Sequence, residues 1–202
     1  MQRREFRIRL VNGCKMVKDN EPELTMIDAK FGDADHGQSM TAITNTIKNA
    51  VRHSDGGIRS ILNGVAEAVL LVSGGSAVPL WYSWLCGLAE NAPEANEISE
   101  EELKTMFKGG LDSISVLTKA EVGDKTMMDA LIPATEAIMN AEGSADEMFF
   151  SAADAAEAGA KKTAEYVAKF GRAKSFGDAT IGTPDAGAYS MMYFFMGLAD
   201  KF

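Results

Sequence analysis

Apolar residues recur at intervals of three and four along almost the whole chain, which is the spacing of one face of an α-helix. Between positions 4 and 18 this stripe consists of Phe6, Leu10, Val11, Cys14 and Val17. Strand-like alternation of polar and apolar residues is absent throughout. The periodicity therefore predicts an all-α fold, with helices near 4–18, 40–51, 61–72, 80–88 and 103–114.

Helix starts are signalled by two capping boxes, Ser99 with Glu102 and Ser144 with Glu147. The helix that begins after Ser144 is rich in alanine, and we expect it to end near 169–170 with Gly171 as its stop. Such a run of small side chains permits close packing between helices.

Two further helices are expected in the second half of the chain. Asp124 is placed to cap a helix that contains Pro133, a residue that tends to kink helices. The run 188–198 is apolar on most sides, as expected of a helix at the centre of a bundle. The segment between them, 172–185, is predicted to be a loop.

Length and composition indicate one domain covering 1–202, large enough to bury a core without disulfides. The formal charge of −9 argues against duplex nucleic acid and anionic membranes as partners. Cys14 and Cys86 are expected to be reduced and buried, and with His36 and His53 they show no zinc-site spacing. No stretch approaches eighteen consecutive apolar residues, so the cytoplasm is the expected compartment.

The stretch 24–41 gathers three carboxylates, Asp28, Asp33 and Asp35, around Gly32 and Gly37, which would let the backbone turn sharply. Like charges this close repel one another unless a divalent cation joins them, and magnesium prefers such hard oxygen ligands. A solvated Asp and Gly turn is the alternative. A calcium EF-hand is excluded, because Gln38 and Thr44 stand where its glycine and glutamate are required.

Two other segments are candidates for binding phosphate. The loop 73–76, Ser-Gly-Gly-Ser, follows a helix and could offer backbone amides, although it could equally be a plain turn. Arg172 carries forked donors that match phosphate oxygens, or it could form a surface salt bridge. No Walker lysine and no GxGxxG motif are present, so neither a P-loop nor a Rossmann fold is indicated.

Four ordered motifs resemble those of the nucleotide-binding L subunit of dihydroxyacetone kinase. They are Asp28 with Gly32-Asp33-Ala34-Asp35-His36-Gly37, then Gly74 to Leu80, then Gly123 to Pro133, and lastly Gly171 to Ala173 with Asp185 to Ala188. The resemblance covers nearly the whole chain.

This resemblance implies an antiparallel barrel or bundle of about eight helices, with the site in loops at one end. It implies that Asp28, Asp33 and Asp35 hold two magnesium ions that carry ADP or ATP. The nucleotide contacts that it implies are His36, Gly37, Gln38, Ser39, Ser76, Ala77, Thr126, Arg172, Asp185, Ala186 and Gly187. The chemistry expected is phosphoryl transfer by positioning and charge neutralisation, with no catalytic side chain and no nucleophilic role for His36.

The family pattern also implies partners. One is a K-type subunit that holds dihydroxyacetone or a related ketose. Another is a phosphohistidine protein of the phosphotransferase system, which is one option for the phosphoryl donor. A homodimer is also possible. The chain departs from the pattern at Ser39, at Ala77-Val78, at Thr118 and at Ala186. Because these positions lie in or near the implied pocket, a nucleotide-loaded regulator with little phosphotransfer is the alternative function.

Overall fold

The computed structural model describes residues 1–199, and within them the secondary structure is helical, as the periodicity predicts. The α-helices are α1 Arg3–Asp19, α2 Glu21–Asp28, α3 His36–His53, α4 Ile58–Leu70, α5 Ala77–Glu90, α6 Glu100–Leu117, α7 Met128–Asn140, α8 Ala145–Lys162 and α9 Ala186–Leu198. Two 3-10 segments, η1 Thr163–Glu165 and η2 Arg172–Thr180, separate α8 from α9. None of the helices described is long and apolar enough to cross a membrane.

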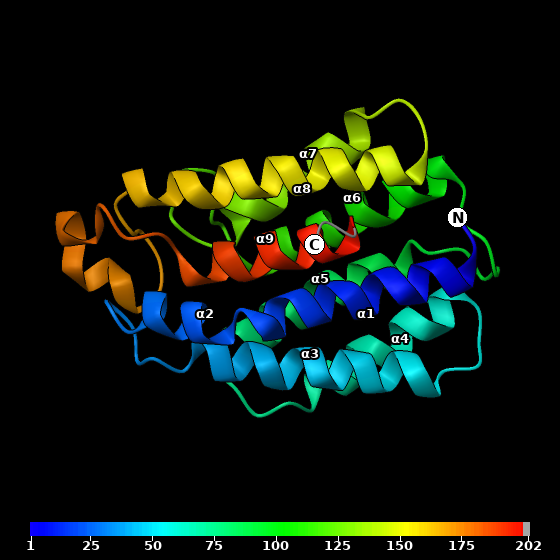
Figure 1. Ribbon diagram of the computed structural model, residues 1–202, viewed down its shortest axis with the longest axis horizontal. Coiled ribbons are helices and arrows are strands. Elements are labelled where there is room, and N and C mark those ends of the chain that lie inside the picture. The colour runs from blue at the N-terminus through cyan, green and yellow to red at the C-terminus, as the bar shows by residue number, and fades with distance from the viewer. Residues whose placement is uncertain (200–202) are drawn as a thin grey trace.

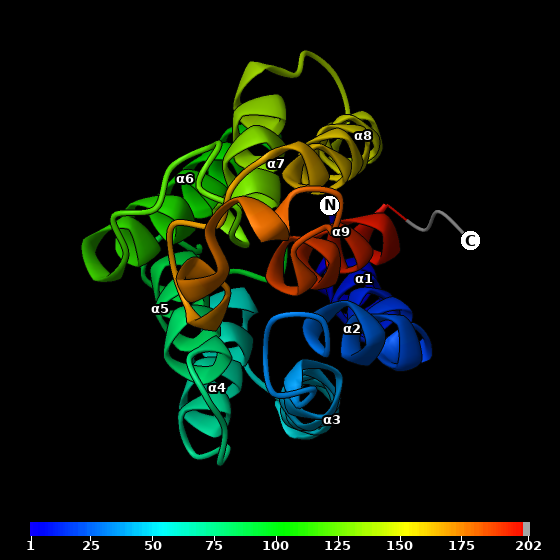
Figure 2. The same cartoon turned by 90° about the vertical axis from the view of Figure 1, so that its left-hand side faces the viewer.

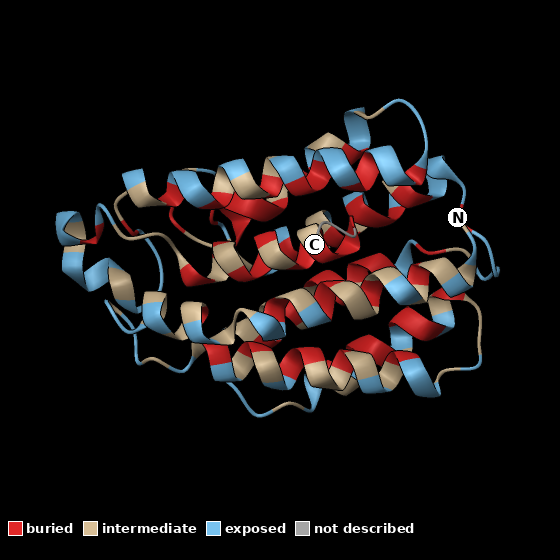
Figure 3. Cartoon of the chain, viewed as in Figure 1, coloured by how far each residue is buried: buried red, intermediate tan, exposed pale blue. Residues whose placement is uncertain are grey.

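Eight of the helices form a closed ring in which each packs on its neighbours, in the order α1, α3, α4, α5, α6, α7, α8, α9 and back to α1 (Figure 1 and, seen from one end, Figure 2). The short helix α2 packs against α3 and α9 near one end of the ring (Figure 1). The predicted antiparallel barrel of about eight helices is therefore confirmed. Buried residues face the interior of the ring, whereas the outer faces are exposed (Figure 3).

Aromatic side chains from facing helices fill the core. Trp81 and Trp84 of α5 pack edge-on with ring centroids 5.5 Å apart, and both rings pack edge-on against Phe194 of α9. Phe107 of α6 joins this cluster through Trp84 and through Phe149 of α8. These contacts make both tryptophans part of the core, and they hold α9 against the facing helix α5.

Both predicted capping boxes are present, so α6 and α8 begin where the sequence indicates. The end of α8 was predicted incorrectly, because the helix stops at Lys162 rather than near 169–170. The chain leaves the helix at Thr163, whose side-chain hydroxyl donates to the Ala160 carbonyl and whose own carbonyl accepts from Lys125. A distant lysine thus takes up a helix-end carbonyl, and no local pattern could signal that stop.

The predicted cap at Asp124 is also wrong. Helix α7 begins at Met128, and the Asp124 carboxylate instead accepts from the Glu121 amide at 2.8 Å and the Lys169 ammonium at 2.6 Å. Lys125 follows with φ +61, which turns the chain away before a helix can start. Asp129 holds the resulting turn by accepting the Gly123 and Thr126 amides at 2.6 and 2.7 Å.

The segment 172–185, predicted to be a loop, contains the 3-10 segment η2, which is interrupted by Gly177 at φ +53. Cys14 and Cys86 are free thiols, as expected, with Cys14 buried and Cys86 partly buried. Because neighbouring long helices alternate in direction, α3, α5, α7 and α9 all begin at the same end of the ring (Figure 1). That end carries the connections 29–35, 71–76, 118–127 and 163–185.

Candidate functional site

A cavity of about 570 Å³ opens between these four connections. Its wall includes the carboxylates Asp28, Asp33 and Asp35, the loop residues Gly75, Ser76 and Thr126, and Arg172 from the start of η2. Apolar side chains, among them Ile27, Leu80 and Trp81, also line it. The wall therefore combines charged and apolar side chains, as a ligand with a charged group and a flat apolar group requires.

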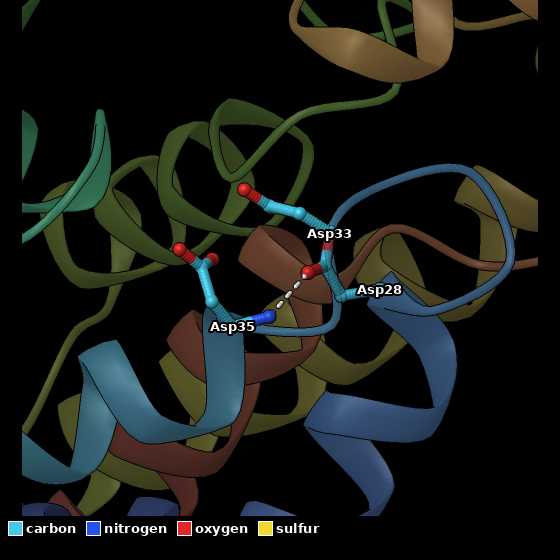
Figure 4. Close-up of side chains that lie close together, drawn as sticks. All are labelled: Asp28, Asp33 and Asp35. Carbon is cyan, nitrogen blue, oxygen red and sulfur yellow. Dashed lines mark hydrogen bonds between the residues drawn. The ribbon is translucent and has the colours of Figure 1, made fainter.

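The three aspartates converge on one side of this cavity. Asp28 ends α2, Asp33 lies in the connection and Asp35 precedes α3; each can offer an oxygen within 4.8 Å of the other two. Figure 4 shows that Oδ2 of Asp28 accepts the Asp35 amide, at 3.1 Å, while the side chains of Asp33 and Asp35 both point to the same side. The His36 amide also donates to Asp28, at 3.3 Å.

The loop reaches this geometry through close approach and one strained residue. A Cβ atom at Gly32 would lie 2.0 Å from Asp28 Oδ1, and one at Gly37 would lie 2.2 Å from the Thr25 hydroxyl. The residue with a left-handed backbone is instead Ala34, at φ +60, between the two exposed carboxylates. The glycines thus supply space rather than the sharp turn expected of them.

The electrostatics of the aspartate cluster favour a bound cation. Desolvation raises the pKa of Asp35 above its ordinary value, and the negative charges of Asp33 and Asp28 raise it further. Arg172 pairs with Asp33 at 2.6 Å, in a contact where the arginine side chain is 71% exposed. This ion pair is the surface salt bridge left open by the sequence, and it keeps the guanidinium at the mouth of the cavity. A convergent set of hard oxygens that repel one another fits magnesium.

The first residues of four helices line the same cavity. Its lining includes His36 of α3, Ala77 of α5, Met128 of α7 and Ala186 of α9, each the first residue of its helix. The first amides of a helix have no acceptor within the helix, and the helix dipole makes that end positive. The cavity is therefore suited to an anion even though the protein carries a net charge of −9.

His36 joins α3 to the start of α9. Its Nε2 lies 3.2 Å from the hydroxyl of Ser190, and that hydroxyl donates to the Gly187 carbonyl at 2.8 Å. Burial lowers the pKa of His36 from its ordinary value, although the negative charge of Asp28 opposes this shift. A ring whose protonation is disfavoured by burial, and that a hydroxyl holds in place, is suited to positioning.

Most of the residues expected to contact a nucleotide lie around this cavity. His36, Ser39, Ser76, Ala77, Thr126, Arg172, Asp185, Ala186 and Gly187 line it. Gly37 and Gln38 do not, because Gly37 is buried against α2 and Gln38 is exposed on α3. Thr118, one of the departures from the family pattern, also lines the wall.

Sequence reasoning missed several residues at the site. Phe31 of the aspartate loop packs against Phe176 of η2 with ring centroids 5.1 Å apart, and Phe31 and Phe170 line the cavity. Lys125 and Ser190 also line it. These residues reach the site through contacts between connections that are far apart in sequence. Only Lys125 had a local signal, because it lies inside the third of the four motifs.

The sequence, compared with known protein families, matches the DAK2 domain family over residues 30–200. The chain belongs to this family. It is 32% identical to the ADP-binding subunit DhaL of the PEP-dependent dihydroxyacetone kinase of Escherichia coli, covering 92% of this chain and 91% of that subunit. The family resemblance inferred from the four motifs is therefore confirmed.

Larger proteins contain the same domain. The L-erythrulose 1-kinase of Mycolicibacterium smegmatis is 35% identical over 87% of this chain, but the match spans only 32% of that kinase. The dihydroxyacetone kinase of C. freundii, solved in complex with AMP-PNP and Mg²⁺, shares the fold with a TM-score of 0.74 and 24% identity. That likeness covers 98% of this chain and 34% of the C. freundii chain.

Proposed function

We propose that this protein is the nucleotide-binding subunit of a ketose kinase and carries ADP or ATP on magnesium held by Asp28, Asp33 and Asp35. The observation that carries the proposal is the convergence of these carboxylates with four helix N-termini around one cavity. The similarity to DhaL, whose name describes an ADP-binding subunit, supports it. Two ions are expected, because three carboxylates and a diphosphate provide ligands for more than one.

Different residues of the site would bind different parts of the nucleotide during phosphoryl transfer. When bound, magnesium would neutralise the charge on the phosphate oxygens. The start of α5, at Ser76 and Ala77, and the start of α9, at Ala186 and Gly187, offer amides to the remaining oxygens. Arg172, on release from Asp33, can supply a bidentate contact to the outermost phosphate. The apolar side chains of the wall, among them Ile27, Leu80 and Trp81, then receive the base.

We place the acceptor on a K-type subunit rather than on this domain, which spans only 32% of the M. smegmatis kinase and 34% of the C. freundii kinase. Apolar side chains that are each at least half exposed form a rim on the connections at this end of the ring and on the last turn of α6: Leu71, Val116, Leu117, Val122, Phe176 and Ile181. Such a rim favours docking of a K-type subunit that presents dihydroxyacetone or erythrulose. A phosphohistidine protein that recharges bound ADP is the proposed donor, with free ATP as the alternative.

Calorimetry of ADP binding, with and without chelator, tests the magnesium requirement. We expect chelation to weaken ADP binding at least a hundredfold, because an acidic protein would otherwise face a polyphosphate without bridging cations. Transfer to dihydroxyacetone is then measured with a K-type subunit added. Unchanged ADP affinity after chelation would remove the metal from the proposal.

A nucleotide-loaded regulator is the second candidate. It is favoured by Ala77 and Ala186, which line the cavity where the family pattern has a serine and a proline. The two candidates differ in phosphoryl transfer, because a regulator binds ADP tightly yet transfers little phosphate to a ketose held by the K-type subunit. A turnover rate comparable to that of an E. coli-type pair would exclude the regulator.

A further inference from the structure

Lys125 is an unusual residue at the base of the cavity. Its side chain is only 4% exposed, and its backbone adopts φ +61, a region that residues other than glycine rarely enter. It lies in the connection between α6 and α7, directly before Thr126. A buried lysine in a strained backbone needs a structural or functional reason.

The ammonium group of Lys125 is fully used inside the protein. It donates to the carbonyl oxygens of Thr163, Tyr166 and Thr183, the second of these at 3.1 Å. An ammonium has three donors and no acceptor capacity, so three carbonyls saturate it. Although Lys125 lines the cavity, no proton of its ammonium is left for a phosphate.

The three carbonyls belong to the first and last segments, 163–166 and 182–185, of the connection that leads from α8 to α9. These two segments are also joined directly, because the Asp185 amide donates to the Thr163 hydroxyl at 2.9 Å and the Gly182 amide donates to the Ala164 carbonyl at 2.7 Å. Asp185 then caps α9 by accepting the Ala188 amide at 2.7 Å. The ammonium therefore lies at the junction that sets where α9 begins.

Two carboxyl groups, Asp185 and Asp129, lie near the ammonium of Lys125. Burial lowers the pKa of Lys125, while the negative charges of Asp185 and Asp129 oppose the shift. The Thr163 carbonyl lies just beyond the C-terminal end of α8, where the helix dipole favours a cation. Asp129 in turn binds the amides of Gly123 and Thr126 on either side of the lysine.

We propose that Lys125 is a positioning residue that sets Thr126 and the N-terminus of α9 at the spacing that a nucleotide requires, by binding three carbonyls of the connection between α8 and α9. It does not touch the phosphates. This inference rests on the proposed function for its ligand, but the arrangement of the connection can be tested without any nucleotide.

The test compares Lys125→Met, Lys125→Arg and a matched control, Lys119→Met. Lys119 is an exposed lysine on the same connection, and it too donates to a carbonyl, that of Ser115 at 3.3 Å. The control thus removes the same charge and the same kind of bond from the surface. ADP affinity is measured by calorimetry at fixed magnesium, and amide hydrogen exchange is measured on the nucleotide-free proteins.

Both Lys125 variants should bind ADP at least tenfold more weakly than wild type, and Lys119→Met should bind within twofold. Without nucleotide, both variants should exchange faster at Gly182, Asp185 and Ala188, while the Asp35 amide, held by Asp28 in a separate loop, should be unaffected. Affinity within twofold of the control would overturn the positioning role. Wild-type affinity in Lys125→Arg alone would also overturn it, because the charge itself would then be reaching the phosphate.

A second pair of variants applies if Lys125→Met does not fold. Thr163→Val removes the hydroxyl that receives the Asp185 amide, and Thr163→Ser keeps it. We expect weaker ADP binding in the valine variant and wild-type binding in the serine variant; equal affinities would overturn the proposal. If wild-type protein fails to bind ADP at all, the proposed function fails, and the exchange measurements still decide the role of Lys125.

Discussion

The carboxyl of Asp185 makes stability depend on pH in an unusual direction. Burial raises its pKa to about 7, against the opposing effect of the Ala188 amide, which favours the charged form. In the unfolded chain the same carboxyl titrates at about 3.9. Between these two values the folded protein holds a proton that the unfolded chain has lost, so the free energy of unfolding contributed by this group falls as pH rises.

The size of this effect follows from the shift. A difference of about three pH units corresponds to roughly 4 kcal/mol, and partial access of water to the side chain reduces this to about 2 to 4 kcal/mol. Asp185→Asn keeps the cap of α9, since asparagine caps helices as well as aspartate does, but it cannot ionise. The variant should therefore match wild type near pH 4 and exceed its stability by that amount at pH 8.

The measurement is urea unfolding of the protein without nucleotide or metal at several pH values between 4 and 8. The difference between wild type and variant isolates Asp185 from the other titrating groups, whose contributions cancel. Asp178→Asn, which removes an exposed carboxylate from η2, serves as the control. Wild type and Asp185→Asn curves that stay parallel across this range would refute the reasoning.

Three further predictions concern the cavity. Asp33→Asn should abolish tight ADP binding yet change the stability of the nucleotide-free protein by less than about 1 kcal/mol. The variant loses an exposed ion pair with Arg172 but relieves repulsion at Asp35. A loss above about 2 kcal/mol in urea unfolding would make Asp33 a structural residue. Ala77→Ser should tighten ADP binding, measured by calorimetry, about tenfold, because it adds one hydrogen bond to a charged acceptor. Val78 is left unchanged in this variant, because it is only 6% exposed and packs in the core. Ala34→Gly should leave the protein equally stable or make it up to about 1 kcal/mol more stable, whereas Ala34→Val should destabilise it, because φ is +60 at this position. The glycine variant should therefore have the higher urea midpoint, and the reverse order would contradict the prediction.

Much of the fold could be predicted from local sequence. Apolar spacing identified the long helices, and the Ser99 and Ser144 capping boxes gave two helix starts, because both signals act within one or two turns. The three aspartates were also recognisable, since a dense cluster of like charges needs a cation wherever the loop lies. Family motifs extended this to most of the residues that line the cavity.

What the sequence alone could not supply depends on contacts between distant segments. The end of α8 at Lys162 and the start of α7 at Met128 both follow from Lys125, whose acceptors lie 38 to 58 positions further along the chain. Local propensity carries no information about such partners, because the pairing exists only once the ring of helices has closed. By itself the sequence determined which segments are helical and which carboxylates gather; the tertiary structure decided where helices stop and which amides face the cavity, because buried polar groups must find partners wherever the packed helices place them.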